Sequence, residues 1–246
     1  MGRLVGAEWL KLRTTRFLWG TVPAVLLLAG VALAGLVLSP EVAGEALLEP
    51  TEDMRQAALH LTSTGAVLVI VLGIVISAGE YRTQTATDTF LTTPRRGHVL
   101  AAKLAIGAIL GLALGSLGAA LALPVAYLLF EADGTTFPAG SEEVWLILGG
   151  VVLSGALFGS LGVAFGSLVR NQLVAVVSAL TSVLLVEQLL TQTADSVARW
   201  LPGNAGAALA RAPGELLEPG AGAAVLLAYS LALAVAGIVV VVRRDA

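Results

Sequence analysis

The chain has 246 residues, of which 57% are hydrophobic and only 13% are charged, whereas a soluble domain is about a quarter charged. The formal net charge is −3 and Lys and Arg form no dense block, which excludes a basic nucleic-acid-binding surface. The chain has no cysteine, so disulfides, thiolate catalysis and cysteine metal sites are excluded as well.

Six apolar stretches are long enough to cross a bilayer whose hydrocarbon core is about 30 Å thick. They predict an all-α integral membrane protein with a single transmembrane domain over residues 1–246. The predicted spans cover about 18–38, 60–79, 103–130, 144–169, 173–192 and 222–242.

Positive charge alternates between the connections that join these spans. Of the 14 Lys and Arg residues, all but Arg55, Arg199 and Arg211 fall at the chain ends or beside the second and fourth connections. Because Lys- and Arg-rich connections stay in the cytoplasm, both termini are predicted to be cytoplasmic. Arg greatly outnumbers Lys, and Ala, Gly, Leu and Val abound, a composition that favours a bacterial protein of the plasma (inner) membrane.

Residues 3–17 mix polar and apolar side chains ahead of the first span. On a helical wheel Val5 and Trp9 share one face with Leu12, while Glu8 and Lys11 lie together beside that face. This pattern predicts an amphipathic helix in the inner headgroup region, with Trp9 as an interface anchor. The alternative is a basic flank that only fixes the topology.

The connection at 80–102 is the longest on the predicted cytoplasmic side. Its threonine-rich stretch lies between Glu80-Tyr81-Arg82 and Pro94-Arg95-Arg96, and the next helix is predicted to start at Val99–Leu104. An inner loop of this length, with a short helix of its own, indicates contact with something in the cytoplasm. The alternative is a solvated loop whose arginines hold the topology.

Glycines recur at four-residue spacing in the third and fourth predicted spans, and Pro124 predicts a kink in the third. Small residues at this spacing let helix backbones approach closely in lipid, either within one subunit or between two subunits. The glycines are Gly107, Gly111, Gly115 and Gly118 in the third span, and Gly155, Gly159, Gly162 and Gly166 in the fourth.

Glu187 is the only acidic residue inside a predicted span, and Gln188 follows it. A carboxyl in the membrane is costly and often lines a translocation pathway, so these two residues are pathway candidates. The alternative is that Glu187 reaches headgroup water or makes a structural hydrogen bond. The outer segment at 193–221 mixes apolar residues with Pro-Gly breaks and predicts two short re-entrant helices, with an ordinary surface loop as the alternative.

Catalytic signatures are missing from the sequence. It has no G-x-x-x-x-G-K-[ST] phosphate loop, no H-E-x-x-H metal motif and no serine-hydrolase elbow. We therefore expect no enzymatic activity and no metal site in this chain.

Two stretches carry a family resemblance: AEWLKLRTTR at 7–16 and GEYRTQTATDTFLTTPRRGHVLAAKL at 79–104. With the order of spans, they make the chain resemble bacterial ABC transporter permeases of the second (ABC-2) exporter type, in the small actinobacterial-like form. Gln84 departs from the pattern, because family members often have Gly before the threonines.

The resemblance implies a permease subunit of an ATP-driven exporter that moves a hydrophobic or amphiphilic substrate such as a drug, antibiotic, peptide or lipid. It implies a second permease subunit, identical or not, and two copies of a separate ABC ATPase that hold ATP and Mg, with no cofactor on this chain. It assigns Glu8, Trp9, Lys11 and Arg13 to an elbow helix. It assigns ATPase coupling to Glu80, Arg82, Thr85, Thr87, Asp88, Phe90, Pro94 and Arg95.

Two other functions remain as alternatives. A proton-coupled secondary transporter would use Glu187, although the sequence has no evident inverted repeat. A membrane anchor or immunity-type binding protein would transport nothing.

Overall fold

A computed structural model describes residues 2–14, 20, 23, 27, 65–79, 96–132, 136, 138–169 and 171–243. Within these residues the structure is all-helical and contains no strand, as the sequence predicts. Four of the helices are long and apolar enough to cross a membrane: Gly97–Pro124, Glu142–Leu168, Gln172–Thr193 and Pro219–Val240. A shorter apolar helix covers Gly65–Gly79. The predicted first span at 18–38 lies almost wholly outside the described residues.

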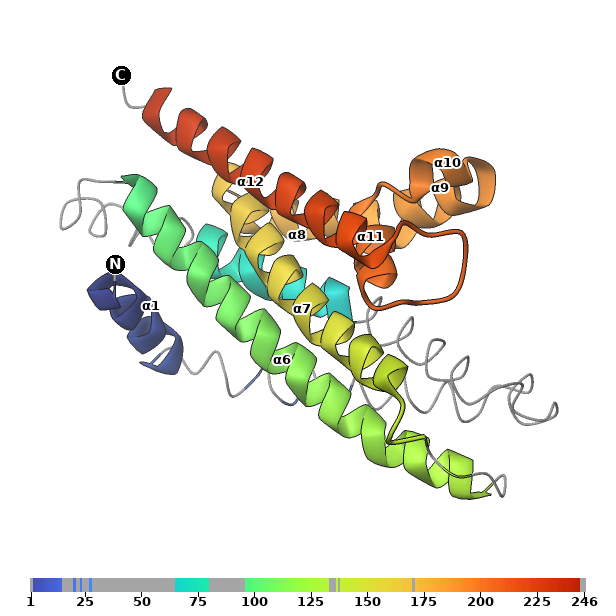
Figure 1. Ribbon diagram of the computed structural model, residues 1–246. Coiled ribbons are helices and arrows are strands. Elements are labelled where there is room, and N and C mark those ends of the chain that lie inside the picture. Colours follow the sequence, from blue (N-terminus) through green and yellow to red (C-terminus); the bar gives the residue numbers. More distant parts are fainter. Residues whose placement is uncertain are drawn as a thin grey trace.

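Figure 1 labels all of the described elements except the helix Gly65–Gly79 and the short π-helical turn. In chain order the elements are α1 (Gly2–Thr14), the helix Gly65–Gly79, α6 (Arg96–Ala132), α7 (Glu142–Leu168), α8 (Gln172–Thr181), the π-helical turn η1 (Ser182–Val186), α9 (Glu187–Thr193), α10 (Asp195–Ala198), α11 (Pro202–Leu209) and α12 (Pro219–Arg243).

Different helix ends and connections lie at the two ends of the bundle (Figure 1). The first turns of α6 and the last turns of α7 and α12 lie at one end, with α1 beside them. The links from α6 to α7 and from α9 to α12 lie at the other end. The described beginning and end of the chain thus share one end of the bundle, and which side of the membrane that end faces stays a prediction.

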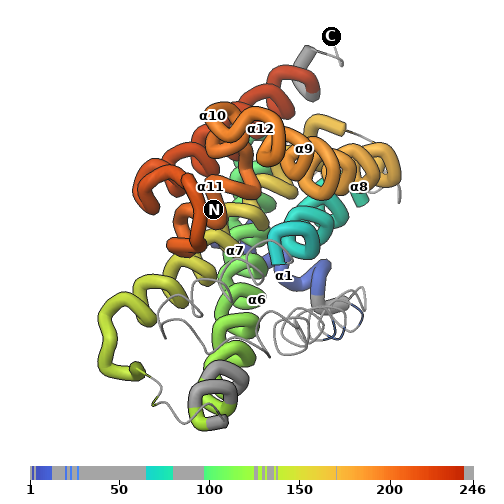
Figure 2. Tube along the Cα trace, turned by 90° about the vertical axis from the view of Figure 1, so that its right-hand side faces the viewer, coloured from blue at the N-terminus to red at the C-terminus, as the bar shows by residue number. Residues whose placement is uncertain are grey.

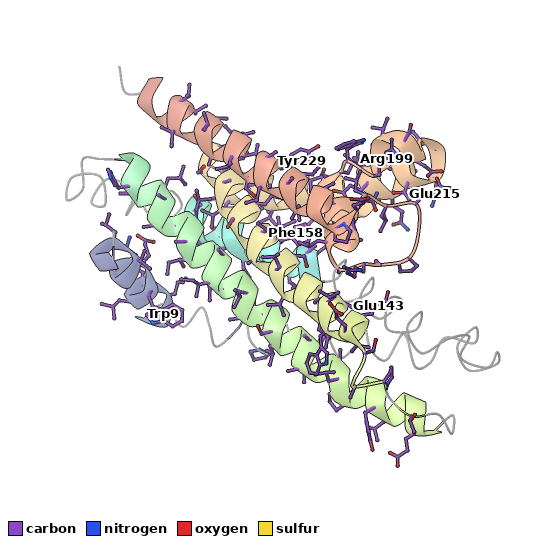
Figure 3. All side chains as sticks on the ribbon, viewed as in Figure 1. Trp9, Glu143, Phe158, Arg199, Glu215 and Tyr229 are labelled. Carbon is purple, nitrogen blue, oxygen red and sulfur yellow. The ribbon has the colours of Figure 1, made fainter. Side chains whose placement is uncertain are left out.

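α7 is the central helix of the bundle. It packs against α6, α11 and α12, and 72% of its most apolar window is buried, against 28% or less in the other three long apolar segments. Figure 2 places α8 and α11 on opposite sides of it. Phe158, which is 1% exposed, lies in the middle of the bundle (Figure 3). α7 is therefore the element around which the others are arranged.

Glycines let α6 and α7 touch along their backbones. A side-chain carbon at Gly107 would lie 2.6 Å from the carbonyl oxygen of Gly159, and one at Gly111 would collide with the carbonyl of Gly155. The four-residue spacing therefore serves packing within one chain. Gly118 differs, because a side-chain carbon there would meet nothing within 4 Å.

α6 begins earlier than the sequence predicts. The helix was predicted to start at Val99–Leu104 and its membrane span at 103, whereas the helix begins at Arg96, up to two turns earlier. The reason is burial: Val99 is 4% exposed and Leu100 is 8% exposed, so the added turns pack against the bundle. The helix also continues through Pro124 and ends at Ala132.

The predicted fifth span is built from three segments rather than one regular helix: α8, η1 and α9. Asn171 caps α8, since its Oδ1 accepts hydrogen bonds from the backbone N–H groups of Leu173 and Val174 at 3.0 Å and 3.2 Å. In the outer segment, the two predicted short helices are present as α10 and α11. α11 is buried against α7 and α12, while its depth in the membrane stays a prediction.

Candidate functional site

Polar side chains gather in two clusters within this apolar bundle. The two are named after the predicted sides of the membrane. The first, the inner cluster, comprises Glu8, Lys11, Lys103 and the carbonyl of Ile76. The second, the outer cluster, comprises Glu187, Thr191, Gly203, Asn204 and the carbonyl of Ala198. They lie toward opposite ends of the bundle, since α1 lies at one end and the α9–α11 region at the other (Figure 1).

The inner cluster is centred on a buried ion pair between α1 and α6. Lys103 Nζ lies 3.0 Å from Glu8 Oε2, and the two side chains are only 6% and 8% exposed. Lys11 Nζ donates to the other carboxylate oxygen, Oε1, at 2.7 Å. Removing one partner of a buried pair typically costs about 3–5 kcal/mol, because the other charge is left uncompensated.

The same ammonium reaches a third helix. Lys103 Nζ donates to the carbonyl oxygen of Ile76 at 3.5 Å. Ile76 lies in the last turn of the helix Gly65–Gly79, where carbonyls have no partner within the helix. A cation is favoured at this end of a helix because the helix dipole is negative there.

The surroundings of Glu8 set its charge. Burial acts to raise the pKa of Glu8, but the charge of Lys103 and the hydrogen bonds from Lys11 and Lys103 outweigh it, so the pKa lies below its ordinary value. Glu8 is therefore ionised at neutral pH, as its ion pair with Lys103 requires.

The inner cluster stands beside the predicted coupling connection. The helix Gly65–Gly79 ends just before residues 80–95, and α6 begins just after them. All eight coupling candidates (Glu80, Arg82, Thr85, Thr87, Asp88, Phe90, Pro94 and Arg95) lie outside the described residues. The structure describes the two helices that flank this connection, which we name its stems: Gly65–Gly79 and α6. Lys103 lies on α6 and contacts both Glu8 of α1 and the Ile76 carbonyl of the other stem.

The elbow candidates occupy one helix with separate roles. Glu8 is buried and paired, while Trp9 is 39% exposed on α1 (Figure 3). Lys11 is 44% exposed and hydrogen-bonds Glu8, and Arg13 lies in the last turn of α1. Lys103 was not predicted as a site residue. The available signal was that it is one of only two lysines in the chain and opens an apolar helix.

The outer cluster joins the fifth apolar segment to α11. Glu187 follows η1 directly, is 6% exposed, and its Oε2 accepts a hydrogen bond from the backbone N–H of Gly203 at 2.8 Å. Gly203 belongs to the first turn of α11, whose N-cap residue Leu201 offers no side-chain cap. The carboxylate thus caps the positive end of α11 from another helix.

Further hydrogen bonds complete the outer cluster. Asn204 Nδ2 donates to Thr191 Oγ1 at 3.1 Å and to the carbonyl of Ala198 at 2.9 Å. Glu187 Oε1 is buried and accepts no hydrogen bond from the described residues. Gln188 is exposed, so the two pathway candidates do not act as one pair. The structural hydrogen bond considered for Glu187 is therefore present.

Neither cluster has the composition of a metal centre. Among the described residues, no group of three or more His, Cys, Asp or Glu side chains is placed to hold a metal ion. The chemistry available in both clusters is ion pairing and helix capping, which position helices.

Several long apolar helices around a glycine-packed central helix, with one polar cluster toward each end, define a multi-pass helical membrane protein. A family model for the ABC-2 family transporter protein matches residues 4–188, which include the inner cluster and reach Gln188. The chain therefore belongs to the ABC-2 family, as a permease-type membrane subunit of an ABC transporter. This result confirms the resemblance found in the sequence. A comparison with curated proteins finds no match.

Proposed function

We propose that this chain is the transmembrane permease subunit of an ATP-driven exporter of the bacterial plasma membrane. The observation that carries the proposal is the family match over residues 4–188. Permeases of this family generally imply an ABC ATPase partner and a dimeric arrangement. In our proposal two permease subunits, identical or not, stand above two ATPase subunits, which hold ATP and Mg, and this chain hydrolyses nothing itself.

The topology in the proposal has six spans with both termini in the cytoplasm. Its support is the charge alternation along the sequence and the gathering of α1, the start of α6 and the end of α12 at one end of the bundle (Figure 1). Glu143, Arg199 and Glu215, on the proposed outer side, lie at the opposite end (Figure 3).

The ATPase contact in the proposal is the connection between the helix Gly65–Gly79 and α6. Phe90 would enter an apolar groove of the ATPase, while Glu80, Arg82, Asp88 and Arg95 fix the register with their charges. Support comes from the two helices that flank this connection, because both contact the inner cluster. A movement of the ATPase against the connection would therefore be transmitted to the bundle. ATP drives such a change only if it binds one arrangement more tightly than the other.

The substrate class in the proposal is a hydrophobic or amphiphilic molecule. An open groove of about 480 Å³ runs along α8 and η1, lined by Leu173, Val174, Val177, Ser178, Thr181, Ser182 and Val186. Its lining is mostly apolar with three hydroxyls, the mixture typical of sites for drug-sized amphiphiles.

Purification of the tagged chain in mild detergent tests the proposal most directly. We expect a stoichiometric partner that carries a phosphate loop and hydrolyses ATP. The variant Phe90→Asp should lose that partner, or lose ATP-driven transport in sealed vesicles, while staying in the membrane. A chain that stays without such a partner across several detergents, or full transport with Phe90→Asp, would contradict the proposal.

The second candidate function is proton-coupled transport through Glu187. The observation that favours it is that Oε1 of this carboxyl is buried and accepts no hydrogen bond from the part of the chain that the structure describes. Glu187→Gln separates the two functions. Glutamine keeps a carbonyl oxygen for the Gly203 N–H but cannot carry a proton, so the exporter should retain ATP-driven transport. Loss of transport in Glu187→Gln, together with unchanged transport in Phe90→Ala, would favour the proton-coupled transporter instead.

A further inference from the structure

The Lys103 ammonium is the point at which three helices meet. It pairs with Glu8 of α1, belongs to α6, and donates to the Ile76 carbonyl in the last turn of the helix Gly65–Gly79. The last two helices are the stems of the connection at residues 80–95. One side chain therefore touches α1 and both stems of the connection at once.

We propose that the Glu8–Lys103 ion pair is a positioning clamp that makes α1 move as one body with the two stems of the 80–95 connection. The inference rests on the proposed function, since it takes the connection as the place where the ATPase acts. Neither residue contacts the ATPase or the substrate in this inference; both act by holding α1 in register with the stems.

Apolar contacts around the pair give α1 its affinity for the bundle. Leu12 of α1 is 8% exposed and belongs to the same buried cluster as Ile76 and Leu100, one from each stem. The cluster continues to Val163 of α7 and Ala234 of α12, so a displacement of α1 and the stems presses on the centre of the bundle.

Hydrophobic contact of this kind is non-directional, and by itself it leaves α1 free to slide or turn by small steps. The ion pair removes that freedom, because the Lys103 ammonium of α6 has fixed partners on two other helices, Glu8 Oε2 of α1 and the Ile76 carbonyl. Buried ion pairs are often no more stabilising than apolar residues of similar volume, and fixing a register is one use for which they are retained. The burial of Glu8 and Lys103 favours register over stability as their role.

The exposed Lys11–Glu8 pair within α1 offers a comparison with the buried Lys103–Glu8 pair. Lys11 is 44% exposed where Lys103 is 6% exposed, and it binds the same carboxylate from within α1. A pair inside one helix cannot fix that helix against its neighbours. Lys11→Met is therefore the matched control for Lys103→Met.

The experiment measures nucleotide-driven distance changes by electron spin resonance, and the cysteine-free chain makes it clean. One label sits at the reference Gly149→Cys, an exposed position on α7 with open space around it. The second label sits either at Thr87→Cys in the connection or at Gly6→Cys, exposed on α1 with nothing within 4 Å of a side-chain carbon. Labelled chain is diluted with unlabelled chain in the complete complex with the ATPase, and distances are compared without nucleotide and with Mg-ATP trapped by vanadate.

In the otherwise unchanged chain, we expect both distances to shift on trapping. In Glu8→Met/Lys103→Met, which keeps the volume and removes both charges together, the Thr87→Cys shift should remain and the Gly6→Cys shift should be lost. Lys103→Arg keeps the charge and should restore the α1 shift, and Lys11→Met should leave it intact. A thermal melt of each complex verifies that the variants are folded.

Each remaining outcome decides against one of the two proposals. No shift at Thr87→Cys in the unchanged chain overturns the proposed function, and the clamp with it. A shift at Thr87→Cys without one at Gly6→Cys in the unchanged chain, or equal α1 shifts in the double variant, overturns the clamp alone. If the double variant does not fold, loss of the α1 shift in Lys103→Arg would contradict the clamp.

Discussion

Gly203 is a position where one added carbon reaches the outer cluster directly. A side-chain carbon there would collide with Oε2 of Glu187, the oxygen that accepts the Gly203 N–H. We expect Gly203→Ala to displace the carboxylate from the start of α11 and to lower stability by about 1–3 kcal/mol, the usual cost of leaving a buried polar group unpaired. Thermal unfolding of the purified complex in detergent measures the effect.

Gly149→Ala is the matched control for Gly203→Ala. Gly149 is also helical, but a side-chain carbon there meets nothing within 4 Å. Alanine should be neutral or raise stability by up to about 1 kcal/mol through its higher helix propensity. Equal destabilisation by the two substitutions would show that the contact with Glu187 has no special weight.

How far the sequence predicts single residues depends on how local their partners are. Glu187 stood out because a carboxyl in an apolar span is rare, and Glu8 because it lies beside Lys11 on a helical wheel. Their decisive partners are distant in sequence: Gly203 is 16 residues from Glu187, and Lys103 is 95 from Glu8. No spacing rule connects residues across a fold, so Lys103 was missed and the capping of α11 could not be predicted.

At the scale of elements, the contact between α6 and α7 depends on a few glycines. A side-chain carbon at Gly111 would strike the Gly155 backbone, which belongs to a helix and cannot give way. We expect Gly111→Ala to force the two helices apart and to cost about 1–3 kcal/mol, as overpacking of a close interface usually does. The midpoint of thermal unfolding is again the measurement.

Gly118→Ala, about two turns further along α6, tests the same substitution away from the contact. Open space surrounds Gly118, so the variant should unfold at the temperature of the unchanged chain or slightly above it. Should Gly118→Ala prove as damaging as Gly111→Ala, glycine would matter to α6 for a reason other than its approach to α7.

Element boundaries were harder to predict than the existence of the elements. The four long apolar segments were recognisable from length and hydropathy alone. The start of α6 at Arg96 was not, because it depends on burial of Val99 and Leu100 against other helices. The π-helical turn η1 has no sequence signature either; its extra residue per turn immediately precedes Glu187 and changes where that side chain points.

At the scale of the whole molecule, the apolar helices and the polar contacts have different structural roles. The apolar segments and their glycines specify a tightly packed bundle around α7, and the two polar clusters hold the elements that meet at its ends. The inner cluster holds α1 and the connection stems, and the outer cluster holds α11. The proposed exporter needs a rigid centre with coupled ends, and this distribution of contacts fits that requirement.

The proposed topology can be tested on the same scale with single cysteines, because the chain has none of its own. Thr51→Cys and Ser141→Cys should react with a membrane-impermeant thiol reagent in intact cells, and Thr87→Cys should react only after permeabilisation. Ser141 is suitable because its side chain makes no capping hydrogen bond at the start of α7, so the substitution leaves the helix intact. The permeabilised sample shows that Thr87→Cys can react, so a lack of labelling in intact cells reports its location and not a lack of reactivity. Reaction of Thr87→Cys in intact cells would show that the connection lies outside the cell, where no cytoplasmic ATPase can reach it. Both the proposed topology and the proposed coupling would then be wrong.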